Sequence, residues 1–131
     1  MSNPKKIVVA EDDQFLSNAY RVKLTKEGFE VKMVVDGEEL LAALKETKPD
    51  LIILDLLMPK KDGFEALREI KEDPNLKNIP VIIASNLGQT NDIDLGLKLG
   101  ANDYIIKSDL SLEELVKKIK GLLAKNPKDT N

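Results

Sequence analysis

The chain has 131 residues, of which 42% are hydrophobic and 33% are charged, and it carries a formal net charge of −3. This length suits one domain with its own core, and the near-neutral charge gives no general electrostatic reason to bind nucleic acid or an anionic membrane. The absence of cysteine and histidine excludes disulfide scaffolds, thiolate metal sites, most zinc sites and a histidine general base. The apolar runs are too short for a membrane span or a signal peptide. We therefore expect a cytoplasmic protein without membrane insertion.

Five short segments are predicted to be strands, at 7–10, 30–34, 51–54, 81–84 and 102–106. Four of them are nearly continuous in aliphatic or β-branched residues instead of alternating, which is typical of strands covered on both faces. Helical patterns fill the segments between them. Because strand and helix alternate five times, we predict an α/β fold, a three-layer αβα sandwich around a mainly parallel five-stranded sheet.

The first predicted helix follows the first strand. Phe15, Leu16, Ala19 and Val22 share one face of it, which we expect to be buried, and Gly28 is expected to end the helix.

The second and third helices carry large apolar residues at helical spacing over 40–44 and 64–70. The fifth has the clearest stripe, over 112–123, and Ser111 with Glu114 forms a capping box at its start.

The fourth predicted helix, 89–99, contains Gly96 and several poor helix formers. We expect it to be the least stable helix of the domain. The domain is predicted to span 1–124, and 125–131 is predicted to be a polar tail.

Polar residues follow four of the predicted strands at the point where each strand ends. They are Glu11, Asp12 and Asp13 after the first strand, Asp55 after the third, Ser85 and Asn86 after the fourth, and Lys107 after the fifth. Since the carboxyl ends of parallel strands share one edge of the sheet, these side chains can converge. A single acid at such a place is often only the N-cap of the next helix, as Asp13 could be, but acids, a hydroxyl and an ammonium at successive strand ends are harder to explain as caps.

Carboxylates that lie close together repel one another unless cations lie among them. Lys107 can balance one charge, and Mg²⁺ suits a small set of carboxylates together with a phosphate. A metal ion, a lysine and a hydroxyl around one carboxylate are the groups needed to hold a phosphoryl group during transfer. Asp55 is then a candidate nucleophile that forms an aspartyl phosphate.

From Lys5 to about Leu123 the chain resembles the receiver domain of two-component response regulators. The residues that carry the resemblance are the acid pair Glu11–Asp12, Asp55 within Asp-Leu-Leu-Met-Pro, the pair Asp62–Gly63, Ser85, Tyr104 and Lys107, in this order. The resemblance implies a flavodoxin-like strand order, 2-1-3-4-5. It also implies that Asp55 is the phosphoacceptor and that Mg²⁺ is the cofactor, held by Asp12, by Glu11 largely through water, by Asp55 and by the backbone carbonyl of Leu57.

The resemblance further implies that Ser85 and Lys107 bind phosphoryl oxygens. Ser85 and Tyr104 would move together on phosphorylation and change the surface formed by the fourth helix, the fifth strand and the fifth helix. From the residues alone, Tyr104 could equally be an amphipathic ring at the edge of the sheet.

Since the chain has no histidine, the resemblance implies that the phosphoryl donor is a separate histidine kinase, a histidine phosphotransfer protein or a small acyl phosphate. We expect no output domain after the last helix, so the signal would leave by contact with an unknown downstream protein, without direct DNA binding. Apart from its own phosphotransfer and self-dephosphorylation we expect no enzymatic activity. The self-dephosphorylation should be slow, because Leu57 and Leu87 flank the path of the attacking water and cannot orient it.

The chain departs from the family pattern at three positions. Ser85 stands where threonine is common but keeps the hydroxyl, and Asn86 replaces a small residue beside the phosphoryl pocket. Ser108 replaces the usual proline after Lys107. Because a cis bond before a residue other than proline costs about 3 kcal/mol, we expect a trans bond here and a changed direction of Lys107.

Three other functions were weighed. The first is a receiver-like interaction module that is never phosphorylated. The second is a phosphatase with an aspartate nucleophile, but such enzymes usually need a second acid where this chain has Leu57. The third is a flavin carrier, but no loop at a strand end is a Ser/Thr/Gly-rich phosphate cradle, and only 4% of residues are aromatic.

Overall fold

The fold is built on a parallel sheet of five strands. In this computed structural model, which describes residues 4–109 and 111–124, the strands lie in the order β2-β1-β3-β4-β5. They are β1 (Lys6–Ala10), β2 (Glu30–Val34), β3 (Leu51–Leu54), β4 (Val81–Ser85) and β5 (Asp103–Ile106). All four pairings are parallel, so the predicted α/β class and strand order are confirmed.

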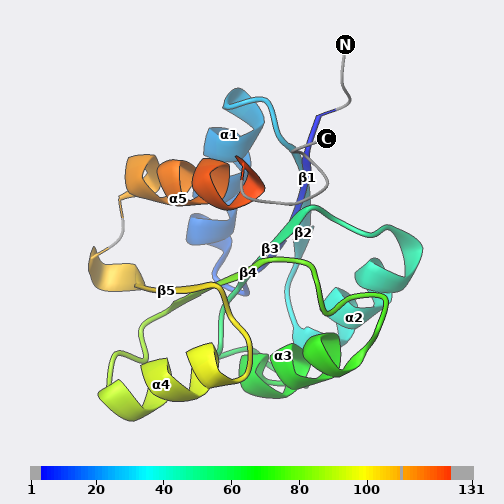
Figure 1. Cartoon of the computed structure of the whole chain (residues 1–131). Coiled ribbons are helices and arrows are strands. Elements are labelled where there is room, and N and C mark those ends of the chain that lie inside the picture. The colour runs from blue at the N-terminus through cyan, green and yellow to red at the C-terminus, as the bar shows by residue number, and fades with distance from the viewer. Residues whose placement is uncertain (1–3, 110, 125–131) are drawn as a thin grey trace.

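Helices connect the strands and cover both faces of the sheet. They are α1 (Gln14–Lys26), α2 (Gly37–Glu46), α3 (Gly63–Glu72), α4 (Thr90–Lys98) and α5 (Leu112–Ala124), and a 3₁₀ turn, η1 (Lys107–Asp109), follows β5. Figure 1 shows α1 and α5 on one face and α2, α3 and α4 on the other. Separate apolar cores lie above and below the sheet. The three central strands β1, β3 and β4 are buried on both sides, which explains their continuous apolar runs, whereas the edge strands β2 and β5 are partly exposed.

Four of the helices begin at a side-chain cap. Asp13, Asp36, Asp62 and Ser111 each accept a hydrogen bond, 2.8–3.0 Å long, from a backbone N–H in the first turn of α1, α2, α3 and α5. Such a cap contributes about 1 kcal/mol. Helix α4 starts at Gln89 without a side-chain cap, which agrees with the expectation that it is the least stable helix.

Helix α1 ends where the sequence predicts, but the face that it buries differs from the predicted one. Gly28 has a φ of +95°, and its N–H bonds to the carbonyl of Thr25, so it ends the helix as predicted. Phe15 and Val22, predicted to face the core, are 83% and 57% exposed. The buried stripe of α1 instead runs through Tyr20 and Leu24, with Leu16 partly buried. The prediction of a buried Phe15–Val22 face was wrong.

The predicted polar tail, 125–131, lies outside the described residues. Within the part of the chain that the structure describes, no helix is long and apolar enough to span a bilayer.

Candidate functional site

The acid pocket, defined here as Glu11, Asp12, Asp55 and Lys107, lies at the carboxyl ends of the strands. Glu11 and Asp12 directly follow β1, Asp55 follows the neighbouring strand β3, and Lys107 follows β5. One carboxylate oxygen from each of Glu11, Asp12 and Asp55 lies within 4.8 Å of the others. The predicted convergence of these four side chains is therefore present in the fold.

Asp55 lies at the base of the acid pocket and is only 4% exposed. Its Oδ1 accepts a hydrogen bond from the backbone N–H of Leu57 at 3.2 Å, and its Oδ2 accepts one from Nζ of Lys107 at 3.0 Å. These bonds fix the carboxylate plane and leave Asp55 open toward Asp12, the exposed member of the acid pocket.

Lys107 bridges two buried carboxylates. Its Nζ lies 2.6 Å from Oε1 of Glu11 as well as 3.0 Å from Asp55. Burial by itself would lower the pKa of Lys107, but the hydrogen bonds and charges of Glu11 and Asp55 outweigh it and raise that pKa above its usual value. The bond between Lys107 and Ser108 is trans, as expected. The ammonium nevertheless pairs with Asp55 and Glu11, so the structure gives no sign of the expected change in the direction of Lys107.

Glu11 is almost completely buried, at 1% exposure. Its Oε1 is paired with Lys107, and its Oε2 accepts a hydrogen bond from the N–H of Asp13 at 3.0 Å. Burial raises the pKa of Glu11, and the hydrogen bonds from Lys107 and Asp13 only partly offset the shift. Three carboxylates share one ammonium here, so the acid pocket keeps an excess of negative charge.

Ser85 and Tyr104 form a second group beside the acid pocket, connected through Leu87. The Ser85 hydroxyl accepts a hydrogen bond from the N–H of Leu87 at 3.2 Å, and the Tyr104 hydroxyl donates to the carbonyl of the same residue. Burial raises the pKa of Tyr104, and the Ser85 hydroxyl opposes this shift. Ser85 ends β4 and Asp55 directly follows the paired strand β3, so the two groups lie at adjacent strand ends.

The remaining sequence candidates have plainer positions. Asp13 caps α1, which is the role expected for an acid after a strand. Asn86 is exposed. Leu57 is 56% exposed, and its backbone N–H donates to Oδ1 of Asp55.

Two features of the site were not predicted from the sequence. Gly63 lets the start of α3 pack against the backbone of the site, because a Cβ on it would lie 2.4 Å from the Asp55 carbonyl oxygen and 2.5 Å from Cα of Leu56. The Asp62–Gly63 turn could have signalled this. The second feature is the connecting role of Leu87, for which the sequence carries no signal.

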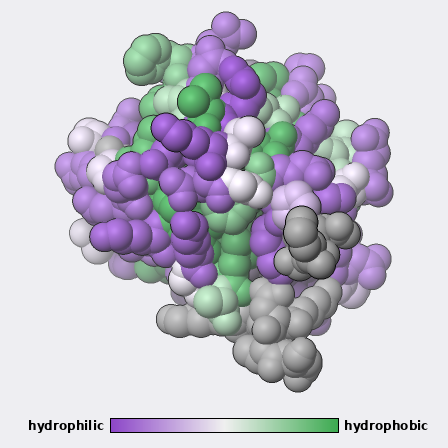
Figure 2. Space-filling view, turned by 90° about the horizontal axis from the view of Figure 1, so that it is seen from above, coloured by the Kyte–Doolittle hydropathy of each residue, from purple (hydrophilic) through white to green (hydrophobic). Residues whose placement is uncertain are grey.

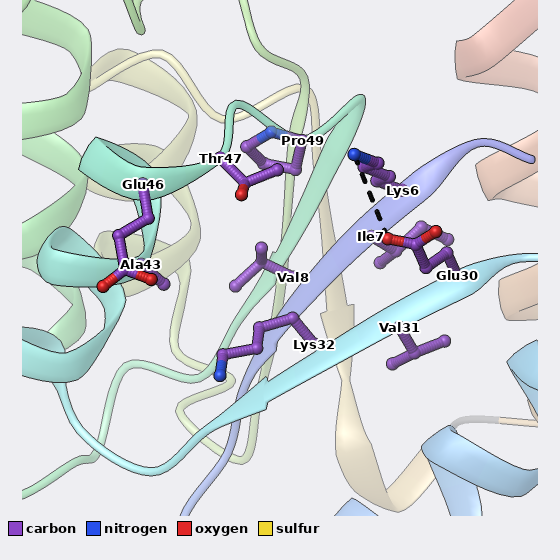
Figure 3. Close-up of a pocket in the computed structure, with 10 residues that line it drawn as sticks. All are labelled: Lys6, Ile7, Val8, Glu30, Val31, Lys32, Ala43, Glu46, Thr47 and Pro49. Atoms are coloured by element: carbon purple, nitrogen blue, oxygen red, sulfur yellow. Dashed lines mark ion pairs between the residues drawn. The ribbon is translucent and has the colours of Figure 1, made fainter. Parts of the chain in front are cut away.

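A separate hollow of about 250 Å³ lies between β1, β2 and the end of α2 (Figure 3). Its charged lining residues are of both signs, and the Lys6 and Glu30 side chains pair with each other at 4.0 Å. It contains no residue of the acid pocket and has no surplus charge to attract a charged ligand. We assign it no function.

The face covered by α1 and α5 is mostly hydrophilic, with hydrophobic groups visible between polar ones (Figure 2). Phe15, near the start of α1, is the most exposed of the large hydrophobic residues on this helix. It stands three residues after Asp12 in the chain.

The family model of the response regulator receiver domain matches residues 7–120. The chain belongs to this family. PhoB of Rhizobium meliloti, a phosphate regulon transcriptional regulatory protein, is 37% identical over 118 residues, which are 90% of this chain and 52% of PhoB. The chain spans about half the length of the first curated relatives it matches.

Solved structures of receiver domains are similar to this fold. The phosphorylated cyanobacterial phytochrome response regulator RcpA is 39% identical with a TM-score of 0.80, and the match covers 94% of each chain. The receiver domain of the sensor histidine kinase PA1611 from Pseudomonas aeruginosa PAO1 is 25% identical with a TM-score of 0.85, covering 93% of this chain and 99% of that one. That structure holds a magnesium ion in its active-site cleft.

Receiver domains bind Mg²⁺ at an acidic pocket, and the residues of this chain fit that ion. Three carboxylate oxygens lie within 4.8 Å of one another, and they are the hard ligands that Mg²⁺ prefers. Lys107 balances only one of the three negative charges, so a divalent cation would relieve the remaining repulsion.

Proposed function

We propose that this receiver domain accepts a phosphoryl group on Asp55 from the phosphohistidine of a partner protein and passes the signal on through the surface of α4, β5 and α5. The observation that carries the proposal is the setting of Asp55. Its buried carboxylate has the Lys107 ammonium at 3.0 Å and oxygens of Glu11 and Asp12 within 4.8 Å. An ammonium and carboxylates that can hold a divalent cation beside one aspartate are what phosphoryl transfer to that aspartate needs.

Asp55 acts as the nucleophile in this proposal. One of its carboxylate oxygens attacks phosphorus, the bond to the donor nitrogen breaks, and the nitrogen leaves with the electron pair. Lys107 turns its ammonium toward a phosphoryl oxygen, and the Ser85 hydroxyl donates to another. Ser85 ends β4, the strand beside β3, and Lys107 follows β5, the strand beside β4. Both residues are therefore positioned by strand ends near Asp55.

Asp12, Glu11, Asp55 and the carbonyl of Leu57 would hold Mg²⁺, with Glu11 acting largely through water. Bound there, the ion supplies positive charge that offsets the charge of the phosphoryl oxygens in the transition state. The residues of the chain provide its geometry, because Glu11 is fixed by Asp13 and Asp55 is fixed by Leu57.

The output path runs through Leu87. Ser85 is bonded to the N–H of Leu87, and Tyr104 is bonded to its carbonyl. A Ser85 hydroxyl that turns to a phosphoryl oxygen therefore disturbs the loop that anchors Tyr104. Helix α4, which follows that loop without a side-chain cap, can shift at low cost, as a two-state switch requires.

Several curated relatives are DNA-binding or transcriptional regulators. This chain has a net charge of −3, which gives little attraction to the phosphate backbone of nucleic acids. We therefore propose that this chain contacts proteins, namely the phosphoryl donor and a downstream target. Beyond its own phosphotransfer and slow self-dephosphorylation, we propose no enzymatic activity.

The proposal is tested by intact-mass measurement after incubation with acetyl phosphate and Mg²⁺. The wild type should gain one phosphoryl group, and both Asp55→Asn and the wild type in EDTA should gain none. Asp62→Asn is the matched control, since Asp62 lies on the same loop and asparagine also caps helices. A wild type that gains no mass would support the alternative of an unphosphorylated interaction module and overturn the proposal.

The donor is tested separately with Phe15→Ala. Because Phe15 is 83% exposed and stands three residues after Asp12 in the chain, a protein donor that docks over the start of α1 can bury it while acetyl phosphate cannot. Transfer from a phosphorylated histidine phosphotransfer protein should slow several-fold, and the reaction with acetyl phosphate should keep its rate. Equal slowing of both reactions would show that Phe15 acts on the site itself and not on the donor.

A further inference from the structure

Tyr20 is completely buried, yet its hydroxyl has no hydrogen-bond partner. Among the described residues it is the one buried side-chain polar atom in this condition. Burying a hydroxyl without a partner costs free energy, and an aliphatic or phenylalanine side chain would fill the same apolar space without that cost. We therefore expect this hydroxyl to have a hydrogen-bond partner in another state of the protein.

The position of Tyr20 places its hydroxyl on the side of the acid pocket. Tyr20 lies on α1 about two turns after the cap residue Asp13, and side chains on a helix lean toward its N-terminus. The N-terminus of α1 adjoins Glu11. The Tyr20 ring packs in the core between the sheet, α1 and α5, and this lean directs it along α1 toward the end at which Glu11 lies.

The electrostatics agree with this position. Burial raises the pKa of Tyr20 to about 12; among the charged groups, Glu11 has the largest effect and raises this pKa, Lys107 lowers it, and Asp55 and Asp13 raise it. The hydroxyl thus stays protonated and remains a donor over the whole physiological pH range.

The acid pocket lacks a donor in the phosphorylated state. At present Oε1 of Glu11 is paired with Lys107, and Oε2 with the N–H of Asp13. If Lys107 turns to a phosphoryl oxygen, as the proposed function requires, Oε1 of Glu11 loses its ion pair, and the only other donor that the proposed function brings to Glu11 is the water through which it would hold Mg²⁺. At 1% exposure this oxygen cannot easily be solvated by bulk water, and an unpaired buried carboxylate oxygen is costly.

We propose that the Tyr20 hydroxyl donates a hydrogen bond to Glu11 in the phosphorylated protein, in place of Lys107. Tyr20 is then a positioning residue, which holds Glu11 while the ammonium serves the phosphoryl group. The inference rests on the proposed function, because the exchange occurs only if Asp55 accepts a phosphoryl group.

The first test compares Tyr20→Phe with the wild type in two conditions. Without a phosphodonor, the urea midpoint should stay equal or rise, because the ring remains and only an unpaired hydroxyl is removed. With acetyl phosphate and Mg²⁺, the steady-state ratio of phosphorylated to unphosphorylated protein should fall roughly tenfold, as expected for the loss of one hydrogen bond to a charged group. Ile119→Val, in the same core on α5, is the control that should lower the urea midpoint without changing this ratio.

The second test observes the hydroxyl directly. The chain has two tyrosines and no tryptophan, so Tyr104→Phe leaves Tyr20 as the only strong fluorophore. Its emission should drop on addition of acetyl phosphate and Mg²⁺, since a hydrogen bond to a carboxylate quenches a phenol. The double variant Tyr104→Phe/Asp55→Asn should show no drop.

Each opposite result has a defined meaning. A lower urea midpoint in unphosphorylated Tyr20→Phe, an unchanged phosphorylation ratio, or Tyr20 emission that ignores phosphorylation overturns this inference alone, provided that the wild type is phosphorylated. A wild type that gains no phosphoryl group overturns the proposed function and this inference with it.

Discussion

Lys107 is the residue on which the acid pocket depends most. Its ammonium is 10% exposed and pairs with two carboxylates that are themselves buried. Removing one partner of a buried ion pair costs about 3–5 kcal/mol, because the other charge is left without compensation. The acid pocket therefore has a single cation, the Lys107 ammonium, and this cation can turn to another partner. In our proposal Glu11 then needs a replacement hydrogen-bond donor.

Leu57 sets the lifetime of the phosphorylated state in our proposal. Its side chain is 56% exposed beside Asp55 and cannot orient a water molecule. Leu57→Asn introduces an amide that can do so, and we expect the half-life of the aspartyl phosphate to shorten several-fold. The measurement is the decay of phosphorylated mass after removal of acetyl phosphate.

Leu97→Asn serves as the control for this experiment, because Leu97 is similarly exposed, at 44%, but lies on α4. Its half-life should equal that of the wild type. An unchanged half-life in Leu57→Asn would contradict the role given to Leu57.

At the scale of elements, the close contact between β3 and α3 shapes the site. A Cβ on Gly63 would overlap the backbone of Asp55 and Leu56, and backbone cannot move aside as a side-chain end can. We expect Gly63→Ala to destabilise the protein by about 1–3 kcal/mol in urea denaturation. We also expect weaker Mg²⁺ binding in calorimetry, because the displaced segment carries the Leu57 carbonyl.

Gly121→Ala is the matched control in a helix. A Cβ there meets nothing within 4 Å, and alanine in a helix is favoured over glycine by about 0.5–1 kcal/mol. This variant should be slightly more stable and should bind Mg²⁺ as the wild type does. Equal behaviour of the two alanine variants would refute the steric argument for Gly63.

The strands and helices also show which parts of the fold could be predicted from the sequence. Continuous apolar runs predicted the central strands because they are buried on both faces, whereas the edge strand β2 was predicted from a weaker pattern and is partly exposed. The face of α1 was mispredicted because two apolar stripes compete on that helix. One runs through Phe15 and Val22, and the other includes Tyr20, whose hydroxyl makes it look polar although its ring fills the core.

The candidate site was predictable to a similar extent. Because the carboxyl ends of parallel strands share one edge of the sheet, the sequence predicted that Glu11, Asp55 and Lys107 lie close together. Their contacts in the structure are close. The link of Ser85 and Tyr104 through Leu87 was not predictable, because it uses backbone groups of a loop. Backbone donors and acceptors leave no trace in the residue types.

For the whole molecule, the excess negative charge of the acid pocket couples metal binding to stability. Mg²⁺ that binds only the folded state should raise the urea midpoint as its concentration increases. Asp12→Asn removes one of the three carboxylates. We expect this variant to be more stable than the wild type in EDTA and to gain much less from Mg²⁺.

Urea denaturation of both proteins in EDTA and in saturating Mg²⁺ gives all four midpoints. A wild type whose midpoint ignores Mg²⁺ would contradict metal binding at the acid pocket. An Asp12→Asn variant with the full wild-type increment would instead place the ion elsewhere in the molecule.

The order of the strands along the chain has a consequence for synthesis. The acids come from β1 and β3, in the interior of the sheet, whereas Lys107 follows β5, the last strand in sequence and an edge of the sheet. A ribosome-bound or proteolytically clipped chain that ends before β5 holds the acids without their counterion. We therefore expect truncated copies that end before β5 to accept no phosphoryl group on Asp55.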